Sequence, residues 1–152
     1  EKTLGDKLAI GIDYVPATLS SETANNDRLD KTASATAASV VNSIKVDFQD
    51  LTTYYLTFNV SDSLYLKAGA VTVDVITKES LGTGSTYGDT SMDGHTFGIG
   101  YTNALGNSGF VRLEGSYMDF GSASVTASNG DNKVSMDNLE GASAKISIGR
   151  SF

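Results

Sequence analysis

Residues 51–70 read LTTYYLTFNVSDSLYLKAGA, and this stretch decides the fold class. Before the polar stretch at 59–63, apolar side chains fill every second position: Tyr54, Leu56, Phe58 and Val60. After it the alternation resumes with Leu64, Leu66, Ala68 and Ala70. Neighbouring side chains of a β-strand point to opposite faces of the sheet. The stretch therefore predicts two antiparallel strands joined by a tight turn, each with one apolar face.

The same two-residue period marks residues 7–16, 95–102, 111–117 and 142–152, so the sequence predicts six strands in all. The opposite face of these strands carries mainly glycine, serine, threonine and charged residues. Such a face would make a poor core between two packed sheets, so we infer that it points inward and the apolar face outward. The prediction is an all-β fold: an antiparallel up-and-down transmembrane β-barrel, in one domain over residues 1–152.

The connections between these strands alternate between short and long. Residues 59–63 and 104–108 are tight turns, whereas 17–42, 79–92 and about 121–133 are longer and polar. Outer-membrane barrels combine short periplasmic turns with longer extracellular loops. The asymmetry therefore predicts a protein of the bacterial outer membrane with both termini in the periplasm.

Two of the strands lose their alternation partway along. After residue 70 the apolar residues take the other phase: Val71, Val73 and Val75. We interpret Gly69 as a β-bulge at this change of phase. Asp50 interrupts the apolar face of the preceding strand in a similar way. At both places we expect the strand to leave the hydrocarbon and continue into an external loop.

Three similar stretches, at 3–11, 59–67 and 105–112, each combine a short turn with the start of a strand. The first of them makes residues 1–3 the expected tail of another strand. Strands in lipid come in closed, even-numbered sets, because an open edge leaves backbone groups without partners. We therefore expect one further N-terminal hairpin and eight strands in the full protein. A closed six-stranded barrel, with a very tight interior, is the alternative.

The chain ends in ASAKISIGRSF, residues 142–152, and its alternating apolar positions finish on an aromatic residue, Phe152. This ending resembles the C-terminal signal of the outer-membrane β-barrel family, which the barrel-assembly machinery reads. Small barrels of the OmpA, OmpX and OmpW types are the most similar in kind. The resemblance implies an assembly signal formed by Ile146, Ile148 and Phe152. Arg150 departs from the pattern, since an aromatic or aliphatic residue is more usual there.

Five charged residues fall on the inward face: Asp13, Lys67, Arg112, Glu114 and Lys145. Counted from the periplasmic ends of their strands they lie at similar heights, so we predict that they meet in one ion-pair network that fills the lumen. The network is interpreted either as an ion-selective constriction or gate, or as charges that neutralise one another in a narrow interior.

Aromatic residues recur near the ends of the strands: Tyr14, Tyr54, Phe58, Tyr101 and Tyr117. They predict the two aromatic girdles that mark the interfaces of a membrane. Ordinary β-propensity in the core of a sandwich is the alternative explanation.

The composition argues against several classes of function. A net charge of −7 disfavours binding to nucleic acid, and the absence of cysteine excludes thiolate metal sites and thiol nucleophiles. His95 has Ser91 nearby but no carboxylate at a spacing that would orient its ring, so we predict no enzyme. The oxygen-rich loops at 89–94 and 129–132 are explained by turn chemistry, so neither a metal nor a cofactor is predicted.

Three functions remain open at this point. The first is a structural or surface-interaction role, in which the external loops, chiefly 17–42, meet lipopolysaccharide, phage or another surface ligand. The second is a passive, porin-like conduit for ions or small apolar molecules. The third is a secreted, soluble β-rich adhesin or fibre module. For the first two, the partners are outer-membrane lipid, lipopolysaccharide and, during biogenesis, the barrel-assembly machinery.

Overall fold

The computed structural model describes residues 1–29, 39–82, 85–128, 130 and 133–150. Over these residues the chain is all-β, as predicted, and it offers no helix long and apolar enough to cross a membrane. The strands are β1 (Lys2–Leu4), β2 (Leu8–Val15), β3 (Leu19–Ser20), β4 (Ala24–Leu29), β5 (Ser39–Asn59), β6 (Leu64–Ser80), β7 (Thr90–Leu105), β8 (Gly109–Phe120), β9 (Ala123–Thr126), β10 (Lys133–Met136) and β11 (Glu140–Arg150).

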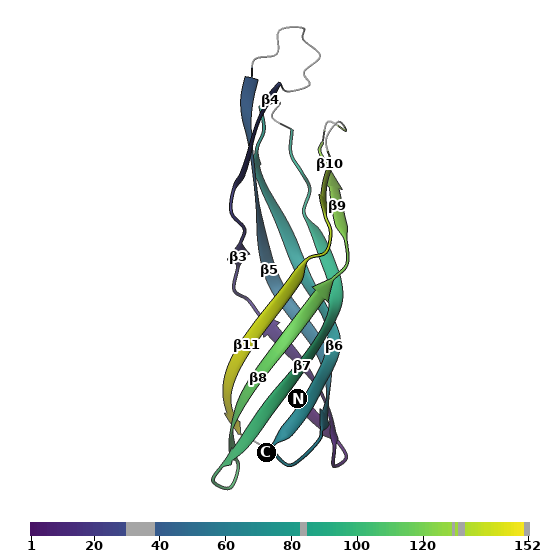
Figure 1. Ribbon diagram of the computed structural model, residues 1–152, viewed down its shortest axis with the longest axis vertical. Helices are drawn as coiled ribbons and strands as arrows, with labels where there is room; N and C mark the ends of the chain where they lie inside the picture. The colour runs from purple at the N-terminus through teal and green to yellow at the C-terminus, as the bar shows by residue number, and fades with distance from the viewer. Residues whose placement is uncertain (30–38, 83–84, 129, 131–132, 151–152) are drawn as a thin grey trace.

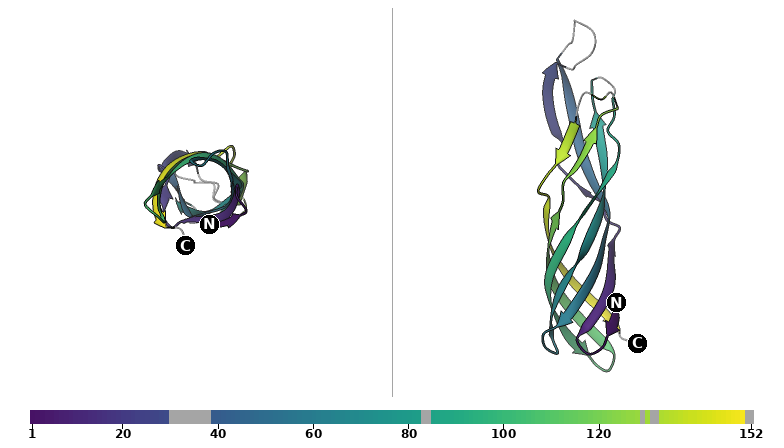
Figure 2. Two further views of the ribbon diagram at one scale, coloured as in Figure 1. Left: turned by 90° about the horizontal axis from the view of Figure 1, so that it is seen from below. Right: turned by 90° about the vertical axis from the view of Figure 1, so that its right-hand side faces the viewer.

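The main sheet is antiparallel and follows the order β1-β2-β5-β6-β7-β8-β11, with β3 and β4 paired to β5 beyond the end of β2. The hairpin of β9 and β10 stands beside its upper end (Figure 1). The sheet curls about the long axis of the molecule, so that its strands trace a ring when seen from below (Figure 2). Among the described residues no strand pairing joins β11 to β1 or β2, so the hydrogen-bonded sheet is not closed. The concave side is called the inner face, the convex side the outer face, and the end with the tight turns the lower end.

The long strands match those predicted from the alternation of apolar residues: β2, β5, β6, β7, β8 and β11. The two predicted tight turns, 59–63 and 104–108, join β5 to β6 and β7 to β8 at the lower end. The strand tail expected at 1–3 corresponds to β1, which pairs with residues Leu8 to Ile10 of β2.

The long upper connections contain more regular structure than the sequence predicted. Most of the described residues within 17–42 form β3, β4 and the start of β5, and β9 with the first residue of β10 lies within 121–133. The connection predicted at 79–92 is shorter, because β6 extends to Ser80 and β7 begins at Thr90. The short strands β3, β4, β9 and β10 are mostly polar and have no sustained alternation of apolar residues. The pattern that predicts a half-buried strand is therefore missing from them.

The β-bulge lies in β5 and not at Gly69, so that prediction was wrong. The pairing of β5 with β6 shifts between Gln49 and Thr52, and Asp50 has a positive φ of 52°. In contrast, β6 runs through Gly69 without interruption, paired with both neighbouring strands. Gly69 is required for another reason: a Cβ there would lie 2.2 Å from the carbonyl oxygen of Tyr54.

The level of this bulge divides the molecule into two sections. The lower section comprises residues 1–15, 52–70, 95–118 and 141–150, and the upper section comprises the other described residues. In the lower section the outer face is apolar. Its large side chains are 36% to 80% exposed and form what we call the apolar belt: Leu8, Ile10, Ile12, Tyr14, Tyr54, Leu56, Phe58, Leu66, Phe97, Ile99, Tyr101, Leu113, Tyr117, Ile146 and Ile148.

In the upper section the apolar residues change to the inner face. Val71, Val73 and Val75 continue the inward positions of β6 and are buried together with Met92 and Phe120. We call this cluster the upper core. Partly buried residues surround it: Val46, Phe48, Leu51, Met118, Ala123, Met136 and Leu139. The prediction of a polar interior therefore holds for the lower section only.

The upper connections are also tied to one another. The amide of Ser128 donates to the carbonyl of Thr86 at 2.8 Å, and the amide of Gly82 donates to Asn42 Oδ1 at 2.9 Å. A second small core lies among them, formed by Tyr87, Val125 and Ala127. The described part of the upper section is therefore a folded body and not a set of independent loops.

Candidate functional site

Four of the five predicted inward charges meet in the lower section. Lys67 Nζ on β6 lies 2.7 Å from Asp13 Oδ2 on β2 and 2.9 Å from Glu114 Oε1 on β8. Lys145 Nζ on β11 lies 2.6 Å from Asp13 Oδ2 and 3.6 Å from Glu114 Oε1. We call these four side chains the charge cluster. Because four different strands supply them, the cluster ties the curled sheet together across its inner side.

Two tyrosines complete the charge cluster. Lys67 and Glu114 are each 5% exposed. Lys67 Nζ lies 4.0 Å from the centre of the Tyr55 ring, and the hydroxyl of Tyr65 donates to Glu114 Oε2 at 2.6 Å. Two carboxylates thus balance two cations, with aromatic and hydroxyl partners for the most buried groups. Charged side chains are tolerated at buried positions when each is paired and hydrogen-bonded.

Arg112 does not join the charge cluster, contrary to the prediction that all five charges meet. It lies two residues nearer the lower turn than Glu114, a step of about 7 Å along a strand. Its guanidinium nitrogens pair with the carboxylate of Glu1 at 2.7 and 3.2 Å. The rings of Tyr65 and Phe110 flank it at 5.0 and 5.2 Å. The alternation of apolar residues does not mark Glu1 as a partner, because it predicts residues 1–3 only as the tail of a strand.

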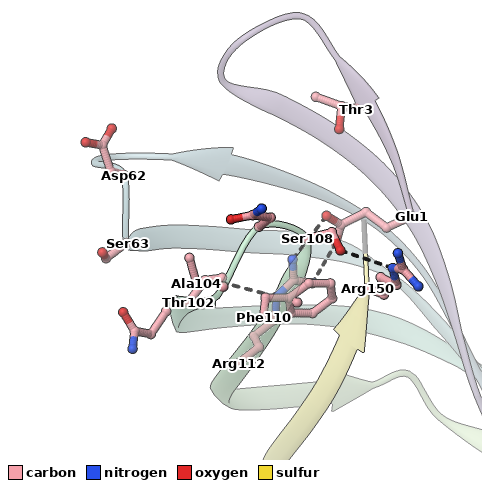
Figure 3. Close-up of a pocket in the computed structure, with 14 residues that line it drawn as sticks. Glu1, Thr3, Asp62, Ser63, Thr102, Ala104, Ser108, Phe110, Arg112 and Arg150 are labelled. Carbon is pink, nitrogen blue, oxygen red and sulfur yellow. Dashed lines mark hydrogen bonds and ion pairs between the residues drawn. The ribbon is translucent and has the colours of Figure 1, made fainter. Parts of the chain in front are cut away.

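Below Arg112 the lower end holds a cavity of about 790 Å³, which Figure 3 shows. Its lining is mostly polar and includes Glu1, Thr102, Arg112 and Arg150. Arg150 donates from Nε to the hydroxyl of Ser108 at 3.0 Å. We call this cavity the lower vestibule. Positive and negative side chains both line it, so it carries no strong preference for ions of one sign.

Aromatic rings on the inner face cover glycines of the neighbouring strand, a feature that the sequence interpretation missed. Tyr55 lies over Gly11, and Tyr65 lies over Gly100. A Cβ on Gly11 would lie only 2.4 Å from Cζ of Tyr55, and a Cβ on Gly100 only 2.0 Å from Cζ of Tyr65. These glycines therefore place the two tyrosines that serve the charge cluster. The signal available in the sequence is an inward glycine directly opposite an inward aromatic residue on the next strand.

Above the charge cluster, the inner face holds the buried threonines Thr53 and Thr96 and then apolar side chains. Along β6 the inward positions run from Lys67 through Gly69 to Val71, and Val71 already belongs to the upper core. Along β6 the inward side chains therefore change from a charge of the cluster to the packed upper core within two inward positions. A water-filled path from the lower vestibule would have to cross both layers.

The five predicted girdle residues all lie on the outer face of the lower section and are 43% to 57% exposed. Phe58 and Tyr101 lie toward the lower turns, and Tyr14, Tyr54 and Tyr117 lie toward the bulge. The hydroxyl of Tyr14 donates to Asp50, at the boundary with the upper section. The aromatic residues thus form two rows, one at each end of the apolar belt.

Of the predicted assembly signal, Ile146 and Ile148 lie on the outer face of β11 and are the most exposed members of the apolar belt. Phe152 lies outside the described residues. His95 also faces outward, opposite Ala70 on β6 and Asp119 on β8. No group of His, Asp or Glu side chains within the described ranges is arranged to hold a metal ion.

Comparison with known proteins gives no match, whether to a protein-family model, a curated protein or a solved structure.

Proposed function

We propose that this chain is a membrane-spanning β-barrel of a bacterial outer membrane, with a structural or surface-interaction role carried by its upper section. One observation carries the proposal. In the lower section the large apolar residues are on the outer face, whereas the charged residues are on the inner face. A protein surrounded by hydrocarbon needs this arrangement, and a protein surrounded by water needs its inverse.

The size of the apolar belt argues against the soluble adhesin or fibre module. Its large side chains encircle the lower section on all six long strands. Soluble monomers rarely expose continuous apolar patches above a few hundred Å². The two aromatic rows at the ends of the belt support a membrane in the same position, because tyrosine rings favour both membrane interfaces.

The orientation follows from the two ends. The lower end has tight turns and both ends of the described chain (Figure 2), whereas the described upper section is folded and exposes few large apolar residues, Leu19 and Val41. Outer-membrane barrels place short turns in the periplasm and large connections outside the cell. We therefore propose that the upper section is extracellular, where lipopolysaccharide, phage or another surface ligand would meet it.

A passive conduit is the second candidate, favoured by the lower vestibule. The charge cluster and the upper core argue against a conduit, because they lie one after the other above the lower vestibule. Planar-bilayer recordings separate the two candidates. We expect no ion conductance from the unmodified protein, and steady conductance that changes on Glu114→Gln would favour the conduit.

The membrane location is tested by extraction and by one matched pair of variants. We expect the protein to resist salt extraction, to require detergent, and to migrate on a gel in a heat-dependent way. Ile99→Lys places a charge in the middle of the apolar belt and should destabilise the folded form by about 2–4 kcal/mol. Asn103→Lys, on the same face of β7 near the lower turn, should cost at most about 1 kcal/mol. Release by salt alone, or equal effects of the two substitutions, would contradict the proposal.

A further inference from the structure

The outer face of the lower section stays apolar over only a short length of each strand. On β7 the outward residues of the belt are Phe97, Ile99 and Tyr101. Polar outward residues bound them, His95 above and Asn103 below. On the other long strands the outward positions carry apolar residues or glycine over stretches of equal length: 8–14 on β2, 54–60 at the lower end of β5, 64–70 on β6, 111–117 on β8 and 142–148 on β11. The apolar belt is therefore a narrow band.

The height of this band follows from strand geometry. The first and last outward residues of such a stretch lie about 20 Å apart along the strand, because a strand rises about 3.4 Å per residue. The strands run obliquely to the long axis (Figure 1), and strands of membrane barrels tilt by about 35–45°. The stretch therefore spans about 14–17 Å along the membrane normal. The apolar band of outer-membrane barrels is about 25 Å tall, so this belt is shorter by about 8–11 Å.

The two aromatic rows are correspondingly close to each other. β5 carries one residue of each row, Phe58 toward the lower turns and Tyr54 toward the bulge. Four positions separate them, which is about 14 Å along the strand and about 10–11 Å along the membrane normal. Because the rings of such rows lie at the two membrane interfaces, the hydrocarbon between them is thin.

Exposed carboxylates limit the belt from above. On four long strands the first outward carboxylate above the belt is exposed: Asp74 on β6, Asp93 on β7, Asp119 on β8 and Glu140 on β11. Asp50, at the bulge of β5, is also exposed and accepts a hydrogen bond from the outward Tyr14. Aspartate side chains are too short to reach far along the surface. Hydrocarbon therefore cannot rise over these positions without burying ionised groups.

Polar groups also limit the belt from below. Asp6 and Asp62 are exposed in the tight connections of the lower end. Lys2 faces outward on β1 opposite Ile10, and Arg150 is the last outward residue of β11. A belt that is too short for its bilayer gains nothing by tilting, because tilting suits only a belt that is too long. The bilayer itself therefore has to thin around this protein.

We propose that the partner of the outer face is phospholipid with short acyl chains, in a bilayer whose hydrocarbon is only about 15 Å thick at the protein. The proposal rests on the membrane location argued above and adds the kind of lipid that the apolar belt fits. Ordinary hydrocarbon is about 30 Å thick, so longer chains have to compress against the belt. The free energy of this mismatch rises with every Å of added thickness, and the folded protein loses stability accordingly.

The test measures equilibrium stability in vesicles of one phosphatidylcholine at a time. The lipids have chains of about 12, 14, 16 or 18 carbons, the three longer ones monounsaturated so that every bilayer is fluid. The midpoint of urea unfolding is read from the heat-dependent gel migration, in both the folding and the unfolding direction. We expect the highest midpoint at the shortest chain and a lower one with each longer chain. A midpoint that stays constant or rises with chain length would overturn the proposal.

A matched pair of variants separates the height of the belt from the ease with which any barrel enters a thin bilayer. Asp74→Leu, Asp93→Leu and Asp119→Leu together extend the apolar surface upward on three neighbouring strands. The control replaces the same three exposed residues by asparagine, which removes the charges without adding apolar surface. We expect the leucine variant to be most stable in a longer-chain lipid, and the asparagine variant to follow the unmodified protein. The same dependence on chain length in both variants would also overturn the proposal.

This outcome is separable from the membrane proposal. Extraction behaviour and the Ile99→Lys variant report on the location of the protein, whereas the chain-length series reports on the height of its belt. Detergent-dependent extraction together with a midpoint that does not depend on chain length would refute the short-chain partner alone. Release by salt would refute the membrane location itself.

Discussion

The lower and upper sections are built from the same strands with opposite polarity. β6 passes through both without a break: below the bulge level its inward residues are Tyr65, Lys67 and Gly69, and above it they are Val71, Val73 and Val75. The outward residues change in the opposite sense, from Leu66 and Ala68 to Asp74 and Lys78. Backbone geometry cannot explain this inversion, because the alternation of faces is unbroken. A change of surroundings can explain it, with hydrocarbon around the lower section and water around the upper one.

The largest loss of stability should come from placing a charged residue, as found inside the lower section, in the upper core. Val75→Asp puts an unpaired carboxylate at a fully buried position of the upper core, and we expect a loss of about 3–5 kcal/mol. The next residue, Ile76, is on the outer face opposite Asp47, so Ile76→Lys should cost less than about 1 kcal/mol. Urea unfolding in detergent measures both. A tolerated Val75→Asp would contradict the packed upper core.

The next effect concerns the charge cluster. Lys67→Met removes the cation shared by Asp13 and Glu114, and we expect a loss of about 3 kcal/mol because the buried carboxylate of Glu114 keeps only Lys145, at 3.6 Å. Adding Glu114→Gln to this variant should recover part of the loss. Lys78→Met removes an exposed lysine whose partner Asp47 is buried but keeps Lys45 and the Ser20 hydroxyl, so it should cost at most about 1 kcal/mol. If the two lysine variants are equally stable in urea, the cluster is not a buried network.

A smaller effect tests how the inner rings are placed. Gly100→Ala forces the Tyr65 ring away from its position over β7, and with it the hydrogen bond to Glu114. We expect a loss of about 1–3 kcal/mol, typical of overpacking. Gly115→Ala on β8 is the control, since a Cβ there meets nothing within 4 Å. Equal stability of the two variants, measured by thermal unfolding, would contradict this role of Gly100.

The smallest effect is electrostatic and belongs to the upper section. A hydrogen bond from Ser20 at 2.5 Å, and then Lys78 at 3.0 Å, hold the pKa of Asp47 below its usual range. A lowered pKa stabilises the folded state above the unfolded pKa, and this stabilisation is lost as the pH falls below about 4. Asp47→Asn should therefore flatten the acid dependence of amide exchange in β3. An unchanged pH profile would show that the carboxylate does not hold β3 against β5.

The contrast between sections also shows what the sequence can and cannot reveal. Alternation is local, so residues 51–70 suffice to predict two strands and a turn, and the structure has both. The change of phase after Ala70 is visible too, and we interpret it as a bulge at Gly69 where the strand leaves the hydrocarbon; the structure has no bulge there. Period-two alternation alone cannot distinguish a bulge from a change of solvent, because both move the apolar residues to the other set of positions.

The sequence predicts those contacts of the site that depend only on the position of a residue along its strand. It does not predict contacts with a residue outside the alternating segments. Asp13, Lys67, Glu114 and Lys145 met because counting from the turns places them together. Arg112 pairs with Glu1 instead, a residue outside the segments with alternating apolar positions. The contact of Tyr65 with Gly100 was missed for a related reason: it depends on cross-strand register, which alternation does not specify.

The central claim, that the lower section faces lipid and the upper section faces water, is tested most directly by single cysteines along the outer face of β7. Ile99→Cys lies in the apolar belt, and Ser91→Cys lies eight residues higher, on the same face, in the upper section. In membranes, a fluorophore at position 99 should be quenched by nitroxide-labelled lipid, and the cysteine should resist a water-soluble maleimide. Position 91 should show the reverse. Equal labelling of both positions by the water-soluble reagent, with no quenching by lipid at position 99, would contradict the account.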